Sequence, residues 1–103
     1  MRVAWVMKLK PGHEEIYKRK HDEIWPEMLA MMEREGIRNY SIYRHGLTLF
    51  AYLERDTPAP GGKPPADSII WKWWEWMAPH METNPDTSPV TEPVEEMFYF
   101  PGR

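Results

Sequence analysis

The sequence predicts an α+β domain in which a four-stranded antiparallel sheet carries helices on one face. Two patterns predict this class: apolar residues alternate along several short segments, and elsewhere they recur at the spacing of a helix. The chain has 103 residues, enough for one domain, which we assign as residues 1–103. Because a domain of this size has one core, we expect a partner subunit to complete any large enclosed site.

The first strand is expected over residues 2–10, which end at a Pro-Gly pair and place alternate apolar side chains on one face: Val3, Trp5, Met7 and Leu9. From His13 the spacing becomes helical, and one stripe carries Tyr17, His21, Ile24 and Trp25. Pro26 disfavours a continuous helix, so we expect the helix to end or kink near residues 24–25. A second helical piece then runs to Gly36.

Two further strands are expected over residues 37–44 and 47–54, joined by a turn at His45-Gly46. Residues 57–67 are rich in proline and glycine, a composition that predicts a loop. A second helix is expected over residues 70–81 and a last strand over residues 94–100. The order β-α-β-β-α-β is typical of the ferredoxin-like arrangement, with two helices on one face of the sheet.

The predicted sheet and the second helix both carry more apolar surface than one core needs. Ala4 and Val6 lie on the second face of the first strand, and the apolar arc of the helix over residues 70–81 covers about 220°, roughly twice the usual width. A sheet-to-sheet homodimer is the simplest cover for the sheet. The helix arc, which carries four of the six tryptophans, predicts a dimer contact, a surface covered by a loop, or a platform on which a sugar stacks.

Composition excludes several classes of function. The net charge is −3 without a basic stripe, which argues against a nucleic-acid partner and against an anionic membrane surface. Cysteine is absent, so disulfides, thiolate nucleophiles and Cys-bound zinc are excluded. The first residues do not follow the pattern of a signal peptide, so we expect a cytoplasmic protein. Neither a phosphate-binding loop nor a dinucleotide fingerprint is present, so phosphorylated substrates and nicotinamide cofactors are not favoured.

His21 is the leading candidate for proton transfer. It lies within an apolar stripe, one helical turn after Tyr17, and an imidazole can accept or donate a proton near neutral pH. The alternative is a structural histidine bonded to a carbonyl group. His13 and His21 are about 12 Å apart along a helix, so we expect no metal site. Tyr40 and Tyr43 have an odd spacing, so one of them can line a site while the other packs elsewhere.

Four segments carry a resemblance to a known family: EEIYKRKHDEIWPEM, RNYSIY, KWWEWM and NPDTSPV. In order and spacing they resemble the L-rhamnose mutarotase family, from residue 1 to Pro101. The resemblance implies a small cytoplasmic homodimer, a dimeric α+β barrel, that interconverts the α and β anomers of L-rhamnose without a cofactor. The chain departs from the family over residues 57–67, where many relatives have helix-compatible sequences, so the sugar preference can differ.

The resemblance also implies roles for five residues. The family's proton donor falls on His21, its sugar-binding tyrosines fall on Tyr17 and Tyr40, and its paired tryptophans fall on Trp73 and Trp74. We expect His21 to act as an acid toward the ring oxygen, while the other four residues bind the sugar and exclude water. Two alternatives remain open on the same fold: a non-catalytic sugar-binding module and a cofactor-free monooxygenase.

Overall fold

A computed structural model describes residues 1–59 and 61–102 and confirms the predicted α+β class. Four strands form one antiparallel sheet in the order β2-β3-β1-β4, which is the ferredoxin-like order. Their bounds are β1 Arg2–Lys8, β2 Ile37–His45, β3 Thr48–Arg55 and β4 Glu92–Pro93. β2 and β3 form the predicted hairpin, whose two-residue turn begins at Gly46 with a φ of +61°.

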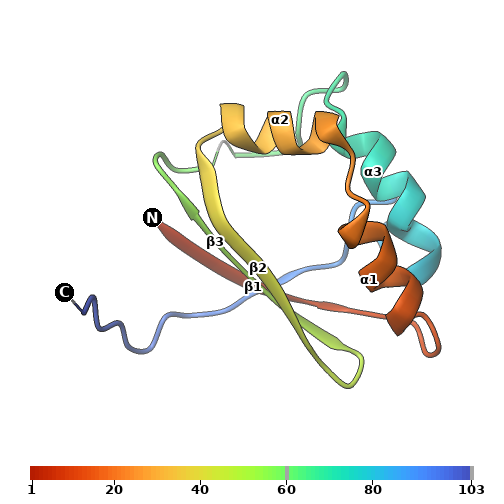
Figure 1. Ribbon diagram of the computed structural model, residues 1–103, viewed down its shortest axis with the longest axis horizontal. Coiled ribbons are helices and arrows are strands. Elements are labelled where there is room, and N and C mark those ends of the chain that lie inside the picture. The colour runs from red at the N-terminus through yellow and green to blue at the C-terminus, as the bar shows by residue number, and fades with distance from the viewer. Residues whose placement is uncertain (60, 103) are drawn as a thin grey trace.

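The helices gather on one side of the sheet (Figure 1). Their bounds are α1 Glu14–Asp22, α2 Pro26–Arg34, α3 Ile70–Met77 and the 3₁₀ turn η1 Ala78–His80. α1 and α2 are separate helices because Pro26 holds Trp25 in an extended conformation, with a ψ of 142°. α3 is shorter than predicted, because Pro79 cannot continue the helical hydrogen bonds. No helix in the described part of the chain is long and apolar enough to span a membrane.

The core lies between the helices and the sheet face that carries Met7, Leu49 and Ala51. It also includes buried side chains from the helices, among them Tyr17, Met28, Met31, Trp73 and Met77. Each of the six tryptophans is buried or half-buried. The chain itself therefore covers the wide apolar arc of α3, which does not form an exposed patch.

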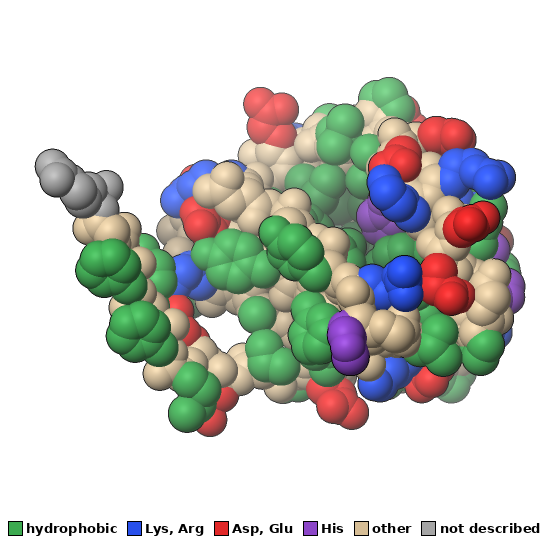
Figure 2. Space-filling view, turned by 60° about the horizontal axis from the view of Figure 1, so that its bottom comes forward, with side chains coloured by type: hydrophobic (Ala, Val, Ile, Leu, Met, Phe, Trp, Pro, Cys, Tyr) green, Lys and Arg blue, Asp and Glu red, His purple; other side chains and the backbone are tan. Residues whose placement is uncertain are grey.

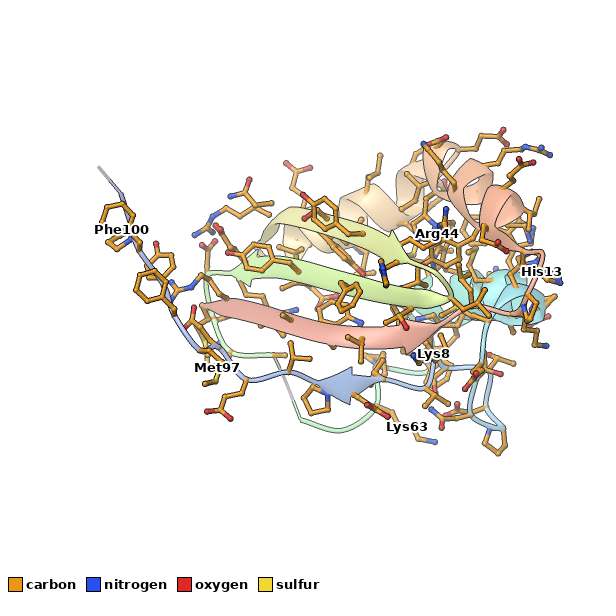
Figure 3. All side chains as sticks on the ribbon, turned by 90° about the horizontal axis from the view of Figure 1, so that it is seen from below. Lys8, His13, Arg44, Lys63, Met97 and Phe100 are labelled. Carbon is orange, nitrogen blue, oxygen red and sulfur yellow. The ribbon has the colours of Figure 1, made fainter. Side chains whose placement is uncertain are left out.

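The predicted last strand over residues 94–100 is wrong for the single chain. β4 pairs Trp5 with Pro93 and Val6 with Glu92, a register that places Glu96 opposite Arg2, the first residue of β1. Residues 97–102 have no neighbouring strand within the described part of the chain, so their β-prone sequence stays unpaired. The segment leaves the body of the molecule as a tail (Figure 1), from which Met97 and Phe100 point outward (Figure 3).

The prediction of a loop over residues 57–67 is confirmed for residues 57–59 and 61–67, which contain no helix or strand. Pro60 lies outside the described residues. The loop does not extend freely into solvent: the indole N–H of Trp71 donates to the backbone carbonyl of Pro65 over 3.0 Å. The loop therefore covers part of α3.

Candidate functional site

A wide, open cavity lies between the inner face of the sheet and the helices, and Figure 2 shows a hollow lined by hydrophobic side chains. Its volume is about 1510 Å³, larger than the roughly 300–1,000 Å³ of most small-molecule pockets. Its walls come from the four strands, the three helices, Ala59, and loop residues within the ranges 62–68 and 84–91. All five residues singled out by the family resemblance line this cavity: Tyr17, His21, Tyr40, Trp73 and Trp74.

His21 is half-buried on α1, with its Nδ1 atom 3.0 Å from the backbone carbonyl oxygen of Tyr17. Because a carbonyl can only accept, Nδ1 carries the proton of the neutral ring. Within the described residues Nε2 makes no hydrogen bond, and it is not sealed from solvent. The hydrogen bond to a carbonyl that is expected of a structural histidine is therefore present. It uses only Nδ1, so Nε2 is available for a ligand.

Burial lowers the pKa of His21 below its ordinary value of 6.5. The hydrogen bond to Tyr17 and the charge of Asp22 oppose this shift but are smaller. At pH 7 the imidazole is mainly neutral, so Nε2 is a proton acceptor in the resting state.

Tyr17 and Tyr40 supply two phenols to the cavity that His21 lines. The rings of Tyr17 and His21 lie one helical turn apart, with centroids separated by 4.4 Å. Burial raises the pKa of Tyr17 far above its usual range, and the nearby phenol of Tyr40 raises it further. Desolvation within the cavity raises the pKa of Tyr40 to about 12, so both phenols stay protonated well above neutral pH. They can therefore hold sugar hydroxyls by hydrogen bonds but do not ionise readily.

Tyr40 follows an irregularity in β2 and lies on the same face of the strand as Ile42, which packs against the core. The register between β2 and β3 shifts between Arg38 and Ser41, and Asn39 has a φ of +51°. The ring of Tyr40 packs on Trp5 at 5.8 Å, whereas Tyr43 pairs with Phe50 on the opposite face. The prediction that the two tyrosines point to opposite faces is confirmed. Tyr40 is 40% exposed, and part of that surface lines the open cavity.

The two adjacent tryptophans have different surroundings. Trp73 is only 6% exposed and meets the ring of His21 edge-on. Trp74 is half-buried in the cavity wall, where it packs edge-on against Trp71. Trp74 therefore offers more surface to a ligand, while Trp73 holds the imidazole in place.

Sequence reasoning missed several contacts at the cavity. Trp25 and Trp76 do not line the cavity, but both pack against the ring of Trp73, which does. Lys63 and Asp86 meet in the cavity wall, although the sequence pattern gave the segment NPDTSPV no chemical role. The Asp-x-Ser spacing is typical of a tight turn and could have predicted the position of Asp86, which accepts hydrogen bonds from Ser88. Among the described residues, no three His, Asp or Glu side chains lie close enough to hold a metal ion.

Comparison with known proteins identifies the family. A family model described as L-rhamnose mutarotase matches residues 2–100. The chain belongs to the L-rhamnose mutarotase family. A relative named L-rhamnose mutarotase from Listeria monocytogenes is 46% identical, over 95% of this chain and 96% of the relative. A relative of the same name from Bacteroides thetaiotaomicron is 41% identical, with the same coverage.

A solved structure from this family has the same fold. The crystal structure of L-rhamnose mutarotase from Formosa agariphila matches with a TM-score of 0.86 and 39% identity, over 97% of this chain and 98% of the other. The family predicted from the four sequence segments is thereby confirmed. The proline-rich segment 57–67 lies within the residues that the family model matches.

Proposed function

We propose that this protein interconverts the α and β anomers of L-rhamnose and that His21 moves the proton. The observation that supports this most is the free Nε2 atom of a mainly neutral imidazole that lines the cavity. Two protonated phenols and a tryptophan wall line the same cavity. Membership of the L-rhamnose mutarotase family favours this chemistry over a sugar-binding module or a monooxygenase.

The proposed reaction moves protons between two oxygens on one carbon. The hydroxyl on C1 loses its proton, the bond between C1 and the ring oxygen breaks, and the ring oxygen gains a proton. The open-chain aldehyde turns about its C1–C2 bond, and the hydroxyl that was the ring oxygen adds to the other face of the carbonyl. Protons are neither consumed nor released overall, so the reaction needs no cofactor.

His21 is the acid that delivers the proton to the ring oxygen. Because its lowered pKa leaves it neutral at rest, Nε2 first takes the proton of the C1 hydroxyl, directly or through a water. Both oxygens are bonded to C1, so one imidazole can reach them in turn. The Nδ1 bond to Tyr17 keeps the ring oriented during both transfers.

The remaining residues bind the sugar in this proposal. Tyr17 and Tyr40 hold hydroxyls through their protonated phenols. Trp74 stacks on an apolar face of the ring, and the nearly buried Trp73 excludes water behind His21. These contacts fix the sugar near Nε2, which converts proton transfer into a step within one complex.

We further propose a homodimer formed through the outer face of the sheet, which we define as the side chains of Ala4, Val6, Tyr43, Phe50 and Tyr52. Tyr43 is 67% exposed, and in the tail Met97 and Phe98 are more than 80% exposed. Apolar surface this continuous is unusual on a monomer. We propose that a second copy of the chain covers this surface. In a two-fold dimer the outer face and the tail of each protomer contact the same surfaces of the other protomer.

The same proposal places the protein in the cytoplasm, as the family resemblance implies. Its partners are a small sugar and a second copy of the chain, rather than nucleic acid or a membrane. The absence of a basic stripe at a net charge of −3 supports a partner other than nucleic acid, and the aromatic side chains in the cavity wall support a sugar ligand.

Anomer exchange measured by saturation-transfer NMR tests the proposed function. One anomeric proton of L-rhamnose is saturated, and the loss of signal from the other anomer reports the exchange rate. Micromolar protein should speed the exchange well above the rate in buffer, in proportion to protein concentration. A rate equal to that of buffer, with the protein shown to be folded by circular dichroism, would contradict the proposal.

A further inference from the structure

Two charged side chains from distant parts of the sequence meet in the cavity wall. The Nζ atom of Lys63 lies 2.9 Å from Oδ2 of Asp86, and both residues line the same cavity as His21. Lys63 comes from the proline-rich loop that precedes α3, and Asp86 comes from the turn before β4 (Figure 3 labels Lys63). The reaction assigned above uses neither of them.

The carboxylate of Asp86 is held rigidly. Its Oδ1 atom accepts hydrogen bonds from the backbone N–H of Ser88, over 3.0 Å, and from the Ser88 hydroxyl. Asn84 donates to the same hydroxyl, so the turn is braced from its other end. The donors from Ser88 and the ammonium of Lys63 lower the pKa of Asp86 far below its usual range. Asp86 is therefore an anion at neutral pH and well below it.

The loop that carries Lys63 is fixed beside the tryptophan wall. Trp71 donates its indole N–H to the carbonyl of Pro65 and packs edge-on against Trp74, with centroids 5.1 Å apart. The loop that carries Lys63 is thus connected to Trp74, the indole that we assign to sugar stacking, through the Trp71–Pro65 hydrogen bond and the Trp71–Trp74 ring contact. Lys63 itself remains 75% exposed at its side chain, so its ammonium can adjust to a ligand.

The pair presents a donor and an acceptor side by side. An ammonium has three N–H donors, of which Asp86 uses one, and Oδ2 retains a free lone pair after accepting from Lys63. Two neighbouring hydroxyls of a sugar match this arrangement: one accepts from Lys63, and the other donates to Asp86. Charge-assisted hydrogen bonds of this kind are stronger than those between neutral groups.

We propose that Lys63 and Asp86 bind two adjacent hydroxyls of the sugar, away from C1, and thereby set which sugars the cavity accepts. This inference rests on the proposed function and adds a selectivity determinant to it. If the ion pair served only to fix the loop, its removal would affect folding stability alone. An exposed ion pair contributes little to that stability. Its removal should change sugar binding far more than folding.

The test compares Lys63→Met with the matched control Lys72→Met, which removes an exposed lysine of α3 outside the cavity lining. Tryptophan fluorescence gives the Kd for L-rhamnose and for its 2-, 3- and 4-deoxy analogues, and NMR exchange gives turnover at saturating sugar. We expect Lys63→Met to raise the Kd for L-rhamnose about tenfold, with turnover within twofold of the parent. Lys63→Arg should restore most of the affinity, and Lys72→Met should match the parent.

The deoxy analogues distinguish recognition from a structural role. The parent should bind the analogue that lacks a contacted hydroxyl about tenfold more weakly, and Lys63→Met should lose most of this preference. Asp86→Asn should lose it as well, although this change also disturbs the turn at Ser88. A Lys63→Met variant with the Kd and the analogue preference of the parent would overturn the inference. A parent that exchanges anomers only at the buffer rate would instead contradict the proposed function.

Discussion

The imidazole of His21 stands edge-on to the indole of Trp73, with the ring planes at 88° and the centroids 5.2 Å apart. Trp73 meets Trp25 with the same distance and angle. A ligand reaches little of Trp73, which is 6% exposed, so its main contact with the site is through His21. We therefore expect the paired tryptophans to have different roles: Trp73 orients His21, and Trp74 stacks on the sugar.

Replacing Trp73 by Phe should lower turnover about tenfold and change the Kd for L-rhamnose by less than about threefold. The smaller ring leaves His21 free to rotate, which misplaces Nε2 after the sugar has bound. Exchange NMR at saturating sugar gives turnover, and circular dichroism confirms folding. A normal rate in a folded variant would show that Trp73 does not orient His21.

Replacing Trp74 by Leu should have the opposite effect. Losing a stacking surface weakens the ground-state and transition-state complexes alike. The binding free energy should therefore weaken by about 1 kcal/mol, which raises the Kd roughly fivefold, with turnover nearly unchanged. The remaining tryptophans still report binding by fluorescence. A fall in turnover at unchanged Kd would assign Trp74 to the chemistry instead.

The pH dependence of kcat/KM should follow the neutral form of His21. Burial lowers its pKa below 6.5, so the rate should be flat at pH 7 to 8. Below that pKa the rate should fall about tenfold per pH unit, because a protonated imidazole cannot accept the C1 proton. Exchange rates corrected for catalysis by the buffer provide the profile. A rate that rises as the pH falls from 7 to 5 would contradict this form of the mechanism.

A pair of histidines away from His21 should make the free energy of unfolding sensitive to pH. Nδ1 of His13 lies 2.9 Å from Nδ1 of His80, so at least one of the two nitrogens must stay unprotonated. Burial lowers the pKa of His80 below 6.5, and the charge of Lys20 lowers it further. Its folded pKa is therefore below its unfolded pKa, so its contribution to stability is present above 6.5 and is lost as the pH falls through the folded pKa.

Denaturant unfolding at pH 7.5 and 5.5 measures this effect. The parent should lose more unfolding free energy between the two pH values than His80→Gln does. His45→Gln is the control, because His45 is exposed at the end of β2. Equal losses in the parent and in His80→Gln would show that His80 does not contribute to the pH dependence of folding in this range.

The proposed dimer predicts the mass in solution. Sedimentation at micromolar concentration should give twice the 12.3 kDa mass of the chain. Phe50→Glu places a charge in the outer face and should yield monomers, whereas Leu29→Glu on α2, across the sheet, should not. Truncation after Pro93 should weaken the dimer by removing the tail. A parent protein that sediments only at the mass of one chain would refute the dimer.

Much of the fold was predictable because local patterns and tertiary packing agree. The alternation in β1 and the Pro26 break were read correctly, and β2 and β3 form the expected hairpin. The last strand failed because β-propensity does not show whether a neighbouring strand exists, and β1 begins too late to pair with residues beyond Glu96. The end of α3 at Met77 could have been read from Pro79.

Residue spacing by itself predicted the site only along single elements, whereas the family resemblance singled out residues from three elements that all line the cavity. The helical spacing placed Tyr17 and His21 together, and the odd spacing separated Tyr40 from Tyr43. Contacts between distant segments leave no mark in a periodic pattern, so Lys63 with Asp86 and His21 with Trp73 were not predicted. The direction of the pKa shift of His21 depends on how deeply the helices bury it, which spacing does not fix.

The His21→Asn variant tests the central claim most directly. Asparagine keeps a hydrogen-bonding side chain but cannot exchange a proton near neutral pH. Anomer exchange of L-rhamnose should fall by about 10² to 10⁴, while the Kd from tryptophan fluorescence stays within a few-fold of the parent. A folded His21→Asn variant that binds L-rhamnose normally and exchanges its anomers at the parent rate would contradict the role of His21.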